Sequence, residues 1–281
     1  SRAEEPFFDP DLLRNRVFMT ASVAGFLSFF GVMAVQLYYP LFMQGIQGIS
    51  ATRSGQVITP LGFLMAFVGV PVGFLVARTK KYKWMFVAGY ALVTLVMFWM
   101  MFFDRDTPAY FGFVAACLSG LALGAMPTVN TIVAQAAVPR RLLGVATSAI
   151  LFSVAMGMAT APAILGSAMN IRYNGVLRAS LPPALGQAAS EATMTSLADP
   201  RVLLSEPAMQ SLRETLAQTG GDGDTLFRQT VDAIRSSMES GLRMVFVISA
   251  VTMLLAFLLI LTIPVIPLDR PVEDKKAVRP A

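Results

Sequence analysis

The sequence contains no histidine and only one cysteine, Cys117, among its 281 residues. The absence of imidazole excludes histidine zinc ligands, Ser-His and Cys-His nucleophile pairs, and histidine proton relays. A single cysteine excludes an intramolecular disulfide, and its place inside an apolar run suits a small core residue. Hydrolytic and metal-dependent membrane enzymes are therefore disfavoured, and we predict neither a metal site nor a cofactor.

Charged residues are also scarce, at 14% of the chain, whereas 55% of the residues are hydrophobic and the mean hydropathy is +0.63. This composition lies outside the usual range of soluble domains and is typical of an integral membrane protein. The net charge of +5 does not indicate nucleic-acid binding, because the strongest basic clusters lie beside apolar runs, where they anchor span ends. We expect the lipid bilayer to be a partner and nucleic acid not to be one.

The stretch at residues 54–84 sets the orientation of the whole chain. Residues 57–77 carry no ionisable side chain, and a helix of this length can cross a hydrocarbon core of about 30 Å. The stretch ends in a basic cluster formed by Arg78, Lys80, Lys81 and Lys83. Because short loops rich in Lys and Arg stay in the cytoplasm, this end is predicted to face inward.

Five other apolar runs are predicted to span the membrane, at about residues 17–43, 84–103, 109–138, 142–169 and 242–266. Arg140 and Arg141 mark a second inward loop, between the fourth and fifth spans. With six spans, both chain ends are predicted to lie in the cytoplasm. We therefore predict an all-α, polytopic membrane protein.

The predicted organisation has five parts: a cytoplasmic lead-in (1–16), spans one to five (17–169), an extracytoplasmic insertion (170–240), the sixth span (241–267) and a cytoplasmic tail (268–281). The insertion is rich in proline, glycine and mixed charge, and its residues 206–217 and 224–238 are predicted to form short amphipathic helices. In the first span, Pro40 is expected to kink or end the helix. Ser50 or Thr52 is expected to cap the second.

Small residues recur every three or four positions in the second, fourth and fifth spans. Such a stripe leaves a smooth face on which a second helix can approach closely. The predicted helix-packing positions are Gly62, Gly69, Gly73, Gly112, Gly120, Gly124 and Gly157.

The first span also carries a face that suits a ligand. Its members follow three-to-four spacing and are Phe29, Met33, Gln36 and Tyr39. Aromatic and methionine side chains adapt to varied apolar ligands and an amide orients them, so this face is predicted to line a cavity for drug-like small molecules. Asn130 and Gln135 line the same cavity or bond across helices. For the whole set, packing alone is the alternative.

Several short motifs occur in an order that resembles the major facilitator superfamily. They are LLRNRVF before the first span, YYPLFMQGIQGISATRSG as the chain leaves it, GFLVARTKKYKW after the second span, and AVPRRLLGVATS between the fourth and fifth. The order is similar to the carboxy-terminal six helices of fourteen-span drug:proton antiporters of the EmrB/QacA type. The resemblance implies a six-helix half of a major-facilitator bundle. The chain does not begin with Met, and its residues 1–11 are charged rather than apolar, so we expect it to begin in the middle of a longer protein.

This sequence departs from the family pattern at three positions. Ala77 stands where the cytoplasmic loop pattern has an acid, and Lys80 stands where it has a glycine. The arginine that often follows the phenylalanine of the fifth-span motif is Ser153 here, directly after Phe152. The roles of the acid and of that arginine are therefore not carried over, and Arg78, Lys80, Lys81, Arg140 and Arg141 are predicted to be cytoplasmic topology anchors.

The resemblance implies transport: one half of a proton-coupled secondary transporter of the plasma (inner) membrane that exports drugs or other lipophilic or cationic small molecules. No carboxylate or histidine lies in any apolar stretch, so protons are expected to couple through a missing amino-terminal half. The alternative is a complete six-span membrane protein that acts as an assembly scaffold or a membrane enzyme. An enzyme should show facing ionisable groups inside the spans, which disfavours that alternative.

Overall fold

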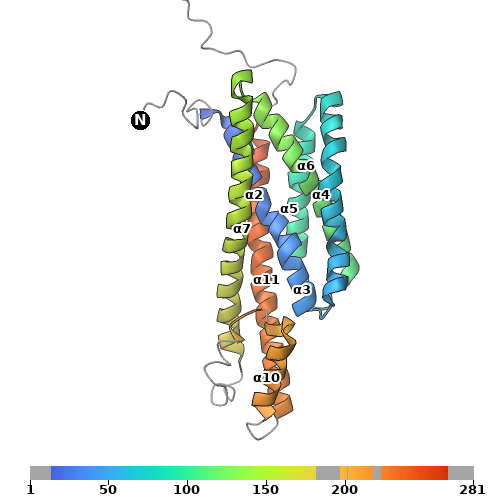
Figure 1. Ribbon diagram of the computed structural model, residues 1–281, viewed down its shortest axis with the longest axis vertical. Helices are drawn as coiled ribbons and strands as arrows, with labels where there is room; N and C mark the ends of the chain where they lie inside the picture. The colour runs from blue at the N-terminus through green and yellow to red at the C-terminus, as the bar shows by residue number, and fades with distance from the viewer. Residues whose placement is uncertain (1–13, 182–196, 201, 218–222, 265–281) are drawn as a thin grey trace, which may run out of the picture.

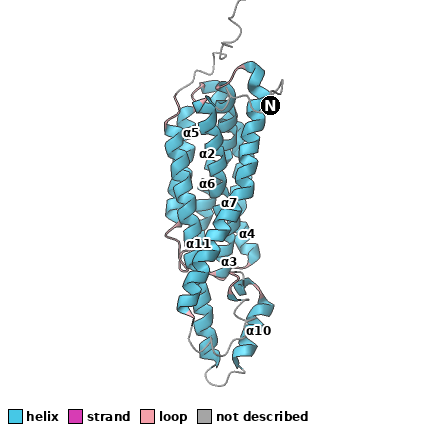
Figure 2. Ribbon diagram, turned by 90° about the vertical axis from the view of Figure 1, so that its left-hand side faces the viewer, coloured by secondary structure: helices cyan, strands magenta, loops and turns pink. Residues whose placement is uncertain are grey.

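The computed structural model describes residues 14–181, 197–200, 202–217 and 223–264, and every regular element in these ranges is helical (Figure 2). Six segments are long and apolar enough to cross a membrane, and they run along one elongated bundle (Figure 1). These segments are Arg16–Gly45, Ala51–Thr79, Lys83–Met100, Ala109–Ala136, Arg140–Ser180 and Gly223–Leu261. The predicted all-helical, six-span fold is confirmed.

The first span is built from three pieces: α2 (Arg16–Met33), the π-helical η1 (Ala34–Tyr38) and α3 (Tyr39–Gly45). Pro40 has no backbone N–H to offer the carbonyl of Gln36, and its ring crowds that carbonyl. The chain accommodates this with wider turns just before the proline. The distortion that was expected at Pro40 is therefore a π segment, after which the span continues.

The second span is α4 (Ala51–Thr79), and both of its ends have a local cause. The Ser50 hydroxyl accepts a hydrogen bond from the backbone N–H of Arg53, as an N-cap residue does. Lys80 closes the other end in the left-handed conformation, with φ of 54°. The helix lies at the edge of the bundle, where it packs chiefly against α6 (Ala109–Ala136).

The third span is α5 (Lys83–Met100), and the fifth is α7 (Leu143–Ser180), which follows the short 3-10 turn η2 (Arg140–Leu142). The sixth span belongs to α11 (Gly223–Leu261). At 1.5 Å per residue, α7 and α11 are each about 57–59 Å long, close to twice a hydrocarbon core of about 30 Å.

Both long helices pass the ends that were predicted for their spans. The fifth span was expected to end near residue 169, but α7 passes Gly175 and continues to Ser180, because Tyr173 and Leu177 are buried against neighbouring segments. Leu181 is extended, as the residue before a proline prefers to be. Likewise, residues 224–238 are not a separate amphipathic helix but the first part of α11.

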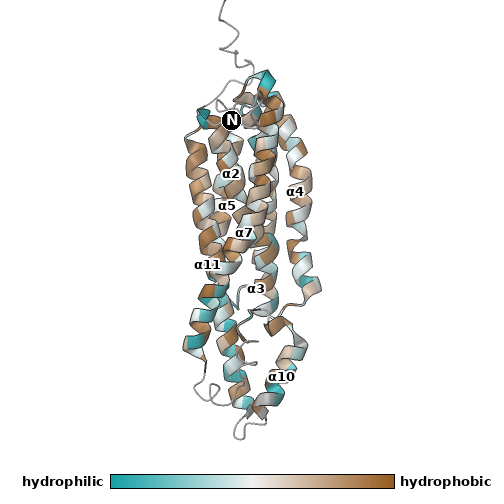
Figure 3. Cartoon of the chain, turned by 60° about the vertical axis from the view of Figure 1, so that its left-hand side comes forward, coloured by the Kyte–Doolittle hydropathy of each residue, from teal (hydrophilic) through white to brown (hydrophobic). Residues whose placement is uncertain are grey.

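We call the helical part beyond the apolar runs at 142–169 and 242–266 the outer extension, after the side of the membrane that is predicted for it; it comprises residues 170–180, η3 (Val202–Leu204), α10 (Glu206–Ala217) and residues 223–240. It is the more hydrophilic end of the molecule (Figure 3). The predicted helix at 206–217 is present as α10. The extension has buried apolar residues of its own: Tyr173, Leu177, Leu212, Leu216 and Ile234.

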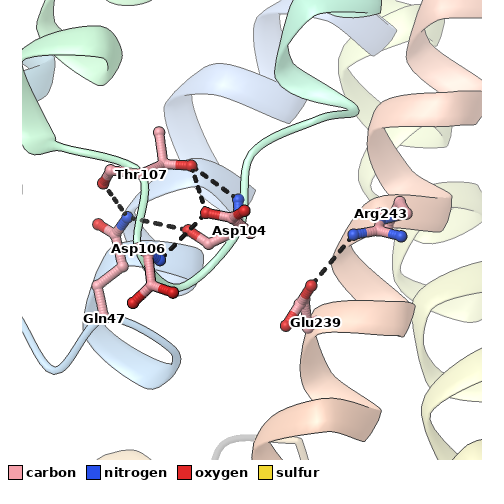
Figure 4. A network of polar contacts seen from close by, with 6 residues as sticks. All are labelled: Gln47, Asp104, Asp106, Thr107, Glu239 and Arg243. Carbon is pink, nitrogen blue, oxygen red and sulfur yellow. Dashed lines mark hydrogen bonds and ion pairs between the residues drawn. The ribbon is translucent and has the colours of Figure 1, made fainter.

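The loops that were predicted to lie on one side of the membrane lie at one end of the bundle. At the end near the outer extension, the Gln47 side-chain amide donates to the backbone carbonyl of Thr107 at 2.8 Å (Figure 4). At the opposite end, Asn15 donates to the carbonyl of Ala137, and the Tyr82 hydroxyl donates to the carbonyl of Pro264 at 3.2 Å. The structure thus places the loops of each predicted side together at one end of the bundle. Which end of the bundle faces the cytoplasm stays a prediction.

Candidate functional site

Three of the four residues that were predicted to form a ligand face on the first span lie on one side of the helix and are accessible. Phe29 and Met33 are half-buried, and Gln36 is exposed within η1. They follow one another along one side of the helix at the predicted spacing. Single π segments are often found at functional sites, so an exposed amide in such a turn is a suitable place for a ligand contact.

Tyr39 does not belong to that face. Its side chain is fully buried, and it stacks on Phe42 with ring centroids 6.0 Å apart. The ring fills the space that a side chain at Gly112 would occupy, and the hydroxyl is buried with no partner among the described residues. Tyr39 therefore packs the bundle, and the prediction that it lines an open cavity is wrong.

Asn130 is also buried, with 2% of its surface exposed. Its amide donates to the hydroxyl of Tyr90 at 3.3 Å, which joins α6 to α5. Gln135 donates to the Thr147 hydroxyl at 3.0 Å and joins α6 to α7. Both amides bond across helices, which is the alternative that the sequence left open, and Asn130 lines no open cavity.

A cavity of about 360 Å³ lies between the first halves of α2 and α7, and we call it the α2–α7 cavity. One wall is the α2 side, and the other is the α7 side. The lining residues are Phe18, Met19, Ser22, Val23, Phe26, Ala149, Phe152, Ser153 and Met156. Its surface is mainly hydrocarbon, aromatic ring and thioether, the composition of a small-molecule site.

The cavity continues the predicted face toward the start of the helix. Met19, Ser22 and Phe26 precede Phe29 at the same three-to-four spacing, so they lie on the same side of α2 as Phe29 and Met33. Sequence reasoning missed these residues because it began the face in the middle of the span. The signal that would have found them is this periodicity, followed back to residue 19.

The cavity ends where α2 and α7 come into contact. A Cβ at Gly157 would lie 2.7 Å from the carbonyl oxygen of Phe26 and 3.1 Å from Cβ of Phe29. Only a glycine allows this approach, which closes the space between the helices just beyond Met156. The cavity is therefore confined to the half of the membrane that is predicted to be cytoplasmic.

Polar groups in the cavity are few and uncharged. The Ser153 hydroxyl donates to the carbonyl of Ala149 at 3.0 Å, a bond within its own helix. The Ser22 hydroxyl is buried and has no hydrogen-bond partner among the described residues. A buried hydroxyl without a partner carries a desolvation cost, which a bound ligand can relieve.

The predicted packing glycines differ in what surrounds them. A Cβ at Gly120 or Gly124 would lie within 3.0 Å of atoms of α4, and one at Gly69 would lie 2.9 Å from the Thr128 hydroxyl. Gly73 faces the Thr128 methyl group at 3.3 Å. Gly62, however, is exposed and has nothing within 4 Å, so it packs against no helix in the described part of the chain.

The predicted topology anchors lie at the end of the bundle opposite the outer extension. Arg78 is in the last turn of α4, Lys80 and Lys81 follow it, and all three are exposed. Arg140 and Arg141 are exposed in η2. A cation in the last turn of a helix is also favoured by the helix dipole, which applies to Arg78.

Sequence comparison matches residues 2–162, more than half of the chain, to the Major Facilitator Superfamily. The chain belongs to the major facilitator superfamily. This superfamily consists of transporters, in agreement with the prediction that the chain is not an enzyme.

Curated relatives are longer than this chain. The multidrug transporter protein MdtP of Bacillus subtilis (strain 168) is 28% identical over 193 residues, which are 69% of this chain and 36% of MdtP. The MFS efflux transporter aclA of Aspergillus oryzae is 33% identical over 153 residues, 54% of this chain and 28% of the relative. Multidrug resistance protein 3 of Bacillus subtilis is 22% identical over 260 residues, 92% of this chain and 48% of the relative. The chain thus spans half or less of the length of these relatives.

Among solved structures, a bacterial homolog of the human lysosomal transporter Spinster, in an inward-facing and unoccupied conformation, superimposes with a TM-score of 0.59. The alignment covers 93% of this chain and 52% of that chain, at 19% identity. At this identity the likeness concerns the fold: the six spans are arranged like about half of that longer chain.

Proposed function

We propose that this chain is the carboxy-terminal six-helix half of a proton-coupled secondary transporter, of the fourteen-span branch, that exports drugs or other lipophilic or cationic small molecules. The observation that carries the proposal is length. The chain aligns over 92% of its residues with multidrug resistance protein 3 and still covers only 48% of that relative. Two bundles that rock around a central site are the usual arrangement of such transporters.

The exposure of α4 supports a second bundle. In its most apolar part 11% of the residues are buried, against 28% to 67% in the other five spans. Gly62 and Ala66 continue the small-residue stripe of α4 but are exposed. Small residues are enriched where transmembrane helices meet, so this part of α4 is a suitable contact for helices outside the chain.

Proton coupling is assigned to the other half. The apolar stretches of the six spans contain no Asp, Glu, Lys or His, and their one arginine is Arg243 at the start of the sixth. A coupling site needs a group that gains and loses a proton between two states, and none of these spans carries a carboxylate or imidazole for it. Gln36 and the α2–α7 cavity supply substrate contacts instead.

The test uses the native protein. An antibody against residues 206–217 is used to measure its mass in source membranes, where a band well above the 30.2 kDa of this chain is expected. The native protein and the isolated chain are then reconstituted in proteoliposomes that contain a pH-sensitive dye. Addition of a drug should release protons only with the native protein. A native band near 30 kDa, or drug-driven proton release by the isolated chain, would contradict the proposal.

A further inference from the structure

The α2–α7 cavity has chemistry that selects among ligands. None of its nine lining residues is charged, and three are phenylalanines. Ser153, the second hydroxyl of the cavity, is likewise uncharged. A cation in this space would gain no counter-ion from the lining residues, and contact with phenylalanine rings replaces only part of the hydration that it gives up there.

One hydrogen-bonding group in the cavity is free to pair with a ligand. Ser22 is 6% exposed, lines the cavity, and has no partner among the described residues. A hydroxyl both donates and accepts, so it can pair with a ligand hydroxyl, amide or carbonyl. The volume, about 360 Å³, is at the small end of ligand sites, which hold about 300 to 1,000 Å³.

We propose that the α2–α7 cavity binds an uncharged, lipophilic, aromatic small molecule with one hydrogen-bonding group, which pairs with the Ser22 hydroxyl. The inference rests on the proposed function, because it names the substrate class at this half's part of the transport path. The phenylalanine rings and thioethers surround the aromatic body. Ser22 fixes the end that carries the polar group.

Two methionines in the cavity allow ligand binding to be followed by photolabelling. Benzophenone, when excited, inserts preferentially at carbon–hydrogen bonds beside a methionine sulfur, and Met19 and Met156 line the cavity. The purified 281-residue chain is irradiated with 4-(hydroxymethyl)benzophenone, and labelled peptides are quantified by mass spectrometry. Met158 is 53% exposed outside the cavity and reports non-specific partitioning. Labelling at Met19 should saturate, and labelling at Met158 should rise linearly.

Three competitors that share the diphenylmethyl group then test the chemistry. Diphenylmethanol is uncharged and has a hydroxyl, diphenylmethane lacks the hydroxyl, and trimethyl(diphenylmethyl)ammonium is a cation. Diphenylmethanol should protect Met19 about fivefold better than diphenylmethane, the ratio that one net hydrogen bond gives. The cation should not protect. In Ser22→Ala the fivefold ratio should fall to about one, and in Ser148→Ala, where an exposed hydroxyl is removed, it should be kept.

A ratio of two competitors does not depend on the fraction of protein that is folded, so a less stable variant remains informative. Met19 labelling that follows Met158 and resists all competitors would overturn the inference. Equal protection by the cation would refute the charge selection. Protection by dioleoylphosphatidylcholine alone would assign the cavity to a lipid chain, and loss of labelling in the longer native protein would assign it to a helix of the other half.

The inference and the proposed function fail separately. If the native protein exchanges drug for protons but diphenylmethanol does not protect Met19, the cavity assignment is wrong and the transporter assignment stands. If Met19 is protected as expected but the native protein releases no protons, the ligand site stands and the proton-coupled function is wrong.

Discussion

Gly124 is a position where a single added carbon should weaken the bundle. A Cβ there would lie 2.8 Å from the carbonyl oxygen of Leu64 and 2.9 Å from Cα of Met65. Both are backbone atoms of α4, which cannot rotate away as a side chain can. Ordinary contact begins near 3.4 Å, so Gly124→Ala forces α4 and α6 apart by about 0.5 Å.

The magnitude follows from two opposing terms. Overpacking in a well-packed interior costs about 1–3 kcal/mol, whereas replacing glycine by alanine inside a helix gains about 1 kcal/mol. Gly62→Ala on the facing helix is the matched control, because it has the same gain and nothing within 4 Å to clash with. The difference between the two variants isolates the overpacking cost, about 1–3 kcal/mol.

The assay is unfolding of the purified chain in mixed micelles as the fraction of sodium dodecyl sulfate is raised, followed by circular dichroism. Gly124→Ala should unfold at a lower fraction than Gly62→Ala, and Gly62→Ala should be at least as stable as the wild type. If the two alanine variants unfold together, α4 and α6 do not depend on close backbone contact at Gly124.

Three further predictions concern other regions. Tyr39→Phe removes a buried hydroxyl without a partner and should not lower the free energy of unfolding, whereas Tyr173→Phe loses a 2.7 Å bond to a backbone carbonyl and should lower it by about 1 kcal/mol. Cysteines placed at Thr79 and Arg105 in a cysteine-free background should react from the cytoplasmic and the outer side, respectively; the opposite pattern in intact cells reverses the topology. Gln36→Ala in the native transporter should change the substrate profile and leave proton coupling intact, and export of every substrate at wild-type rates would contradict the proposed substrate contact at Gln36.

Hydropathy and charge were sufficient to predict the spans. A run of about 20 apolar residues has few stable alternatives to a membrane helix, and basic clusters separate neighbouring runs. The spacing of small residues also located Gly120, Gly124 and Gly157 where backbones approach closely. These features depend on one helix at a time, which is why a linear sequence contains them.

The lengths of α7 and α11 could not be read in the same way. Hydropathy marks where a helix leaves the apolar layer, not where it stops being a helix. Residues 170–180 and 223–240 are polar enough to leave the membrane, yet they bury Tyr173 and Ile234 against their neighbours and so stay helical. Tertiary packing of this kind depends on segments far apart in the chain.

The ligand face shows most clearly where extrapolation along a helix fails. Constant spacing places Tyr39 beside Gln36, but the π turn at η1 holds an extra residue, and each residue rotates the following face by about 100°. Tyr39 is thereby turned into the bundle against Gly112. Before the π turn the spacing is undisturbed, so Met19, Ser22 and Phe26 stay in line with Phe29 and meet α7 across the cavity. The periodicity of the predicted face thus continues toward the start of α2, where α-helical geometry is kept and where the proposed ligand site lies, and it is lost beyond the π segment.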